Sequence, residues 1–167
     1  MMENKGFNIR VYGFLIDEGR ILVTDEFRLG IFMTKFPGGG LIFGEGLTDC
    51  LKREFMEELN VEIDIISHYY TTDFFLASKL LPVESQLINV YYLVQAKKPY
   101  PFKTARKKFD FPEVKDGAQC FRWIPVMELT EEEFTFPIDK FVIHKVKSEF
   151  GNLSPITPSP EGEGAGG

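Results

Sequence analysis

Three glutamates, Glu54, Glu57 and Glu58, lie in a stretch whose apolar spacing predicts a helix over 47–59. On a wheel of about 100° per residue, Glu57 lies roughly −60° and Glu58 roughly +40° from Glu54, so the carboxylates share one arc beside the apolar stripe. Like charges at these spacings repel by about 0.2–0.5 kcal/mol per pair. A hard divalent cation, Mg²⁺ or Mn²⁺, would compensate them, because it prefers carboxylate ligands. The alternative is an acidic helix face that meets only solvent.

The segments on either side of this helix also favour a site. Residues 38–40 are three consecutive glycines, which lets the chain approach itself or a ligand closely. Thr48 is a candidate N-cap for the helix. Asn60 is expected to end the helix in the left-handed conformation, which asparagine tolerates.

A longer pattern joins these features. From Gly39 to Val61 the chain reads Gly, five residues, Glu45, seven residues, Arg53-Glu54-Phe55, one residue, Glu57-Glu58, one residue, Asn60, Val61. This segment resembles the signature of the Nudix hydrolase family, which has Gly where this chain has Asn60. The departure is mild, because that position requires the left-handed backbone conformation, which glycine adopts and asparagine tolerates. The preceding Phe-Pro-Gly and a late strand containing Trp123 are also similar to the family, so the resemblance spans most of residues 7–150.

The resemblance implies a Nudix fold and divalent-metal-dependent cleavage of a nucleoside diphosphate linked to another group. It implies that Glu57 and Glu58 bind the metal ion, Mg²⁺ or Mn²⁺, together with the carbonyl of Gly38. Glu54 would ligate a metal ion or act as the general base. Coordinated metal would neutralise the diphosphate and activate water for attack on one phosphorus.

Supporting roles follow from the same resemblance. Arg53 is expected to pair with a neighbouring glutamate and orient it, and its i,i+4 relation to Glu57 makes this geometrically reasonable. Glu45 is expected to bind metal through water or to support the glycine loop around Gly39. The expected catalytic residues are therefore Glu54, Arg53 and Glu57.

Family members often add a carboxylate from outside the signature. Glu113 and Asp116, which precede the Trp123 strand, are candidates for it, against the alternative of loop acids in water. Arg28 is a candidate phosphate ligand, with a surface arginine at a strand end as the alternative.

The segment 97–108 carries six cations and no acid in a chain of net charge −6. It is either a lid that meets substrate phosphates, with Tyr100 or Phe102 stacking on a base, or a solvated loop between strands. The only cysteines, Cys50 and Cys120, show no metal-ligand or disulfide spacing and are expected to be buried thiols.

The rest of the chain indicates an α/β (α+β) domain, a mixed β-sheet sandwiched between helices. Strand-like runs occur at 7–16, 21–24, 61–67, 69–76, 86–96 and 118–126. Residues 131–134 and then 138–150 are expected to form a C-terminal helix. We expect one Nudix domain over 1–150. Residues 151–167, rich in Gly, Pro, Ser and Glu, are expected to form a flexible tail.

Composition excludes several classes of protein. The chain has 167 residues, 44% hydrophobic, which allows one packed domain and excludes wholesale disorder. The net charge of −6 argues against binding large nucleic acids through general phosphate neutralisation. The N-terminus has neither a signal-peptide core nor a membrane-spanning run. We therefore expect a cytoplasmic protein with no membrane partner; the apolar N-terminal strand offers a surface for a homodimer.

Three functions are consistent with this pattern. The leading hypothesis is a metal-dependent pyrophosphohydrolase acting on a nucleotide, ADP-ribose or a nucleotide sugar. The first alternative is a non-catalytic Nudix-fold sensor of such a ligand, although a sensor has no need for the complete set of glutamates. The second, a diphosphate isomerase on the same fold, lacks an obvious catalytic cysteine.

Overall fold

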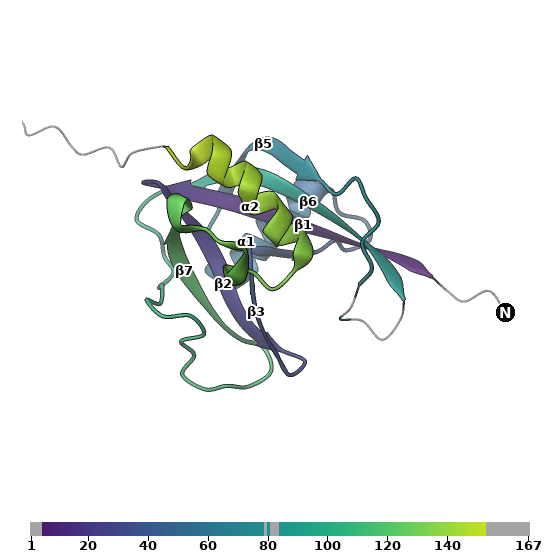
Figure 1. Ribbon diagram of the computed structural model, residues 1–167, viewed down its shortest axis with the longest axis horizontal. Helices are drawn as coiled ribbons and strands as arrows, with labels where there is room; N and C mark the ends of the chain where they lie inside the picture. Colours follow the sequence, from purple (N-terminus) through teal and green to yellow (C-terminus); the bar gives the residue numbers. More distant parts are fainter. Residues whose placement is uncertain (1–4, 79, 81–83, 153–167) are drawn as a thin grey trace, which may run out of the picture.

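The computed structural model describes residues 5–78, 80 and 84–152. In this part of the chain, a seven-stranded mixed sheet lies between two helices, with α2 across one face and α1 behind the other (Figure 1). The strands are β1 (Gly6–Asp17), β2 (Arg20–Arg28), β3 (Ile31–Lys35), β4 (Gly38–Gly40), β5 (Ile63–Thr71), β6 (Ser85–Ala96) and β7 (Ala118–Pro125). The helices are α1 (Leu47–Leu59) and α2 (Pro137–Phe150), with short 3₁₀ turns at Val126–Glu128 and Glu131–Glu133. This arrangement confirms the predicted fold class.

The sheet has the order β3-β2-β1-β6-β5, with β4 paired to β1 and β7 paired to β2. β1 and β6 run parallel over ten residue pairs, from Gly6↔Ser85 to Leu15↔Val94, and the other pairings are antiparallel. The β1–β2 register contains only Ile16↔Ile21 and Asp17↔Arg20. The two strands therefore separate soon after their hairpin, and β4 pairs with β1 beyond that point.

Alternation along β1 creates two hydrophobic cores. Tyr12 and Phe14 pack in the core that α2 covers, whereas Val11 and Leu15 pack in the core that α1 covers. Gly13 lies on the α1 side, where an added Cβ would approach the Phe55 ring to 2.8 Å. The sheet thus holds both helices close to its centre.

The helix predicted over 47–59 is confirmed, and the C-terminal helix begins one residue earlier than predicted, at Pro137. Two predictions at the helices need correction. Residues 131–134 hold a 3₁₀ turn over Glu131–Glu133 that is separate from α2. Thr48 does not cap α1, because Gly46 is the N-cap and its backbone N–H donates to the Asp49 carboxylate at 3.2 Å.

Two strand predictions also differ from the structure. The runs 61–67 and 69–76 were predicted as two strands, but a single strand, β5, extends from residue 63 to 71, because irregular pairing at 65–67 and at 68–70 keeps one ladder to β6 despite broken alternation. Residues 72–76 of the second run lie outside the strand. Residues 31–35 form β3, although they were not predicted to be a strand. From residue 153 onward, the predicted tail lies outside the described residues. No helix in the described part of the chain is long and apolar enough to cross a membrane.

Candidate active site

Arg53 is the centre of the polar group on α1. Its guanidinium donates to both carboxylate oxygens of Glu45 at 2.9 and 2.7 Å. It also donates to Glu54 at 2.9 Å and to Glu57 at 3.3 Å. A further hydrogen bond of 3.1 Å reaches the carbonyl of Gly40 in β4. One side chain therefore joins the helix to the glycine strand and holds three carboxylates in place.

These hydrogen bonds keep Glu45 ionised. The hydrogen bonds from Arg53 lower the pKa of Glu45 to about 2. Glu45 also accepts a hydrogen bond of 2.8 Å from the backbone N–H of Ile42, which fixes the loop ahead of α1. The predicted supporting role of Glu45 is consistent with these contacts.

Two glycines of β4 are required by close contacts, one with a carboxylate of α1 and one with the backbone of β1. An added Cβ on Gly39 would lie 2.4 Å from the Glu54 carboxylate, so only glycine leaves room for that group. Gly38 has φ of +143°, and an added Cβ there would lie 2.1 Å from the carbonyl oxygen of Val11. The left-handed conformation predicted for Asn60 is present, with φ 52° and ψ 40°.

Glu58 differs from the three glutamates that Arg53 binds, because one of its carboxylate oxygens is buried without a hydrogen-bond partner. Burial raises the pKa of Glu58 to about 7. The nearby Lys35 and a hydrogen bond from the Gln119 side chain of β7 act in the opposite direction. Among the described residues, however, no cation forms an ion pair with Glu58, so an ionised carboxylate here is not directly neutralised.

The residues fit a divalent metal ion. Within the described ranges, no group of three or more histidine, cysteine or acidic side chains is already arranged as a metal site. The unpartnered oxygen of Glu58 and the Glu54 carboxylate against Gly39 are nevertheless oxygen donors of the kind that Mg²⁺ and Mn²⁺ prefer. Redirecting carboxylate oxygens from Arg53 to the ion would complete such a site.

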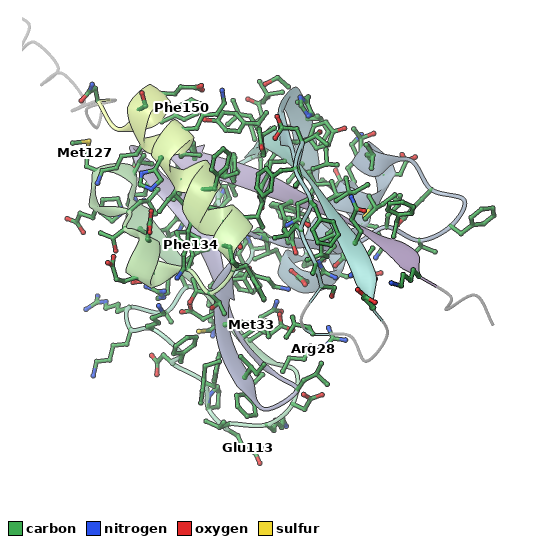
Figure 2. All side chains as sticks on the ribbon, turned by 45° about the vertical axis from the view of Figure 1, so that its right-hand side comes forward. Arg28, Met33, Glu113, Met127, Phe134 and Phe150 are labelled. Carbon is green, nitrogen blue, oxygen red and sulfur yellow. The ribbon has the colours of Figure 1, made fainter. Side chains whose placement is uncertain are left out.

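The two acidic candidates outside the signature make contacts with residues other than the glutamates of α1. Glu113 is exposed and pairs with Lys115 at 3.4 Å, and Figure 2 places it at the outer end of the molecule. Asp116 accepts a hydrogen bond of 2.7 Å from the backbone N–H of Leu29. Among the described residues, no hydrogen bond or ion pair joins either of them to Glu54, Glu57 or Glu58. The β7 side chain beside Glu58 is Gln119.

The basic segment 97–108 is partly engaged in packing. Lys98 pairs with Asp17 at 2.8 Å. The rings of Tyr100 and Phe102 stack with centroids 5.3 Å apart, and both pack against Trp123. These two aromatic faces therefore contribute to the edge of the α1 core, as expected for an ordered connection between strands. Of the cysteines, Cys50 is buried and Cys120 is only half-buried, because it lies on the partly covered start of β7.

The structure also contains a pocket that was not predicted from the sequence. A pocket of about 190 Å³ opens on the α2 face, where β1 and β2 separate, and Arg10, Glu26, Lys35 and Asn89 contribute to its lining. Arg28 lies at this pocket with an exposed side chain, 3.9 Å from Glu26. Figure 2 labels Arg28 and Met33 on the β2–β3 side of the molecule, and both residues line the pocket. Alternation of Arg10 with Tyr12 and Phe14 in β1 was the available sequence signal.

A mixed sheet between two helices, with a glycine strand and an arginine-bridged glutamate helix against it, defines the Nudix fold. The family model for the NUDIX domain matches residues 6–144, and the chain therefore belongs to this family. A comparison with curated proteins found no match.

Solved structures with the same fold have low sequence identity to this chain. A NUDIX hydrolase from Nitrosomonas europaea matches with a TM-score of 0.64 and 16% identity, over 90% of this chain and 93% of that one. A MutT NUDIX hydrolase from Burkholderia pseudomallei matches with a TM-score of 0.64 and 16% identity, over 86% and 99%. An ADP-ribose pyrophosphatase from Streptococcus suis matches with a TM-score of 0.55 and 13% identity, over 84% and 91%.

Proposed function

We propose that this chain is a divalent-metal-dependent pyrophosphohydrolase. Its substrate would be a nucleoside diphosphate linked to another moiety, such as a nucleotide, ADP-ribose or a nucleotide sugar. The observation that carries the proposal is the polar group around Arg53. Three glutamates, two on α1 and one in the loop before it, are held by Arg53 against a glycine strand, and a fourth, Glu58, has a buried oxygen without a partner. The domain over 1–150 would contain this whole site.

The proposed roles follow from these contacts. Glu57 and Glu58 would hold the metal ion, with Glu54 and the Gly38 carbonyl beside them. When bound, Mg²⁺ or Mn²⁺ would neutralise diphosphate charge and make water a better nucleophile. Glu54 would accept the proton of the attacking water, because its carboxylate lies at the glycine strand, where the diphosphate can approach the backbone closely. Arg53 would keep Glu54 and Glu57 oriented through the reaction.

The partial exposure of the group also supports catalysis. The Glu57 side chain is 59% exposed, whereas that of Glu54 is 15% exposed. Substrate and metal can therefore reach one carboxylate from solvent, while the other stays in a fixed position.

The test is a phosphate-release screen with Mg²⁺ or Mn²⁺ over nucleoside triphosphates, ADP-ribose, nucleotide sugars and dinucleoside polyphosphates. Glu57→Gln is the site variant, and Glu62→Gln, an exposed glutamate outside the signature, is the matched control. We expect metal-dependent turnover that falls by about 100-fold or more in Glu57→Gln, as for loss of a group that stabilises transition-state charge, and that persists in Glu62→Gln.

Two results would contradict the proposal. Unchanged hydrolysis in Glu57→Gln would remove Glu57 from the metal site. Absence of hydrolysis from the wild-type protein across the panel, with ligand-induced thermal stabilisation retained, would favour the non-catalytic sensor.

A further inference from the structure

The pocket on the α2 face has a composition suited to one ring system. Its volume of about 190 Å³ is below the roughly 300–1,000 Å³ of pockets that enclose a whole drug-sized ligand. Apolar side chains from β3, β6 and the start of α2 contribute much of its wall, among them Met33, Leu87 and Phe136. A sugar would bury several hydroxyl groups against these side chains without partners, whereas a planar heterocycle would bury mainly its apolar faces.

Asn89 supplies a fixed hydrogen-bond acceptor in this pocket. The residue is 4% exposed and lines the cavity, and its side-chain oxygen has no partner in the protein. Tyr91 donates its hydroxyl proton to Asp139 at 2.8 Å and therefore accepts the hydrogen bond of 3.3 Å from the Asn89 amide nitrogen. This orientation leaves the amide oxygen free for an N–H donor on a ligand.

Arg10 supplies a cation that the protein does not neutralise by direct pairing. Its Nε donates to the Tyr12 hydroxyl at 2.6 Å. Within residues 5–78, 80 and 84–152, no carboxylate forms an ion pair with it. Lys35 differs, because it pairs with Glu26 at 2.8 Å. Arg10 is therefore the pocket cation best suited to bind an anionic group of a ligand.

The position of Arg10 connects the pocket to the glutamate site. An added Cβ on Gly40 would lie 3.7 Å from Arg10 Nη1, whereas an added Cβ on Gly39 would meet the Glu54 carboxylate. Because successive residues of a strand face opposite sides, β4 separates Arg10 from Glu54 by a single strand without side chains. A phosphate chain that passes over β4 can contact both.

We propose that this pocket binds the nucleobase of the substrate, with Asn89 accepting a hydrogen bond from an N–H group of the base and Arg10 binding the adjacent phosphate. The link to a scissile diphosphate rests on the proposed function. The base and phosphate contacts themselves need no hydrolysis, so binding can be measured without metal.

The test measures binding of AMP, GMP and CMP by calorimetry in EDTA at pH 8, with ribose 5-phosphate as the probe that lacks a base. We expect each nucleotide to bind at least about tenfold more tightly than ribose 5-phosphate, since a lost buried hydrogen bond and ring contact weaken binding by that order. Asn89→Leu should remove this difference and leave ribose 5-phosphate binding unchanged. Arg10→Gln should weaken nucleotides and ribose 5-phosphate alike.

Control variants keep the test decisive. Arg20→Gln is matched to Arg10→Gln, because Arg20 also lies over an aromatic ring, that of Trp123, and it should leave binding unchanged. Leu87→Trp fills the pocket without altering the Asn89 side chain, so it decides the result if Asn89→Leu fails to fold. Equal binding of ribose 5-phosphate and nucleotides, or nucleotide binding unaffected by Leu87→Trp or Arg10→Gln, would overturn this inference.

The two proposals can fail separately. Base-dependent binding without hydrolysis would retain the pocket assignment and reject the enzyme. Metal-dependent hydrolysis that is insensitive to Arg10→Gln and Asn89→Leu would retain the enzyme and reject the pocket assignment.

Discussion

Two arginines, Arg53 and Arg122, each bind carboxylates. The two groups differ in how completely the protein satisfies the hydrogen-bonding capacity of the carboxylate oxygens. At Arg122, Asp25 is fully buried and bonds the guanidinium through both carboxylate oxygens. The same carboxylate accepts from the Thr34 hydroxyl at 2.7 Å and from the Phe109 backbone N–H at 3.2 Å. At Arg53, the glutamates are partly exposed, and the neighbouring Glu58 keeps a buried oxygen without a partner.

The difference separates a structural ion pair from a candidate catalytic group. The Asp25 carboxylate joins β2, β3, β7 and the loop at 109, and its hydrogen-bonding capacity is filled by the protein. The glutamates on α1 keep oxygens that a cation can use. Satisfaction of the buried polar atoms distinguishes the two groups better than their charge does.

The largest expected effect is on stability, at Asp25. Asp25→Asn leaves Arg122 buried without its full counter-charge, and breaking such a pair costs about 3–5 kcal/mol. Denaturant unfolding should show this loss, with Asp64→Asn on exposed β5 as the control. Turnover per folded molecule should stay near wild type. A stability loss below about 1 kcal/mol would mean that the ion pair of Asp25 with Arg122 does not stabilise the fold.

The next effect is on catalysis, at Arg53. Lysine cannot reproduce the paired hydrogen bonds to Glu45 together with those to Glu54 and Glu57, so Arg53→Lys should lower turnover about 10–100-fold. Steady-state kinetics of Arg53→Lys and of the exposed Lys52→Arg on the same helix provide the comparison. Equal losses in both variants would show a general helix effect instead of an orienting role.

A smaller effect of opposite sign is expected at Glu58. Glu58→Gln removes a poorly solvated acid, so it should stabilise the metal-free protein by about 1 kcal/mol at pH 8, within the penalty for an unsatisfied buried group. The same variant should lose the stabilisation that Mg²⁺ gives to the wild type. Thermal unfolding with EDTA and with Mg²⁺ measures both. Destabilisation in EDTA would place Glu58 with Asp25 as a structural acid.

The smallest effect concerns Asp139. This carboxyl is buried and accepts a hydrogen bond from Tyr91, so it is intermediate between the fully paired Asp25 and the incompletely paired Glu58. Burial raises the pKa of Asp139 to about 7. The folded state therefore holds a proton that the unfolded state releases near pH 4, and this contribution to stability is complete below pH 4 and lost as pH rises through 7. Between pH 6 and 8 the loss should be about 1 kcal/mol.

Asp139→Asn should flatten this part of the stability profile. Denaturant midpoints at pH 6 and pH 8 for both proteins measure the difference. An unchanged slope in the variant would assign the pH dependence to another group.

The sequence predicted local features well and long-range ones poorly. The helix at 47–59, its left-handed end at Asn60 and the Arg53 contact to Glu57 depend on neighbours within one or two turns. The pocket could not be predicted, because Arg10 and Asn89 lie on different strands that come together only through the parallel pairing of β1 with β6. Gln119 was missed because amides beside a carboxylate have no distinctive spacing.

The parallel ladder of β1 and β6 also has a consequence for how the chain is made. Gly6 pairs with Ser85, so β1 leaves the ribosome long before its partner strand exists. At about 5–20 residues per second, that delay lasts several seconds, during which an apolar strand has an open edge. The first antiparallel partners, β2 and β4, are available sooner and can shield part of it. Premature termination between β4 and β6 should therefore yield aggregating fragments, because only the completion of β6 pairs this edge of β1 along its length.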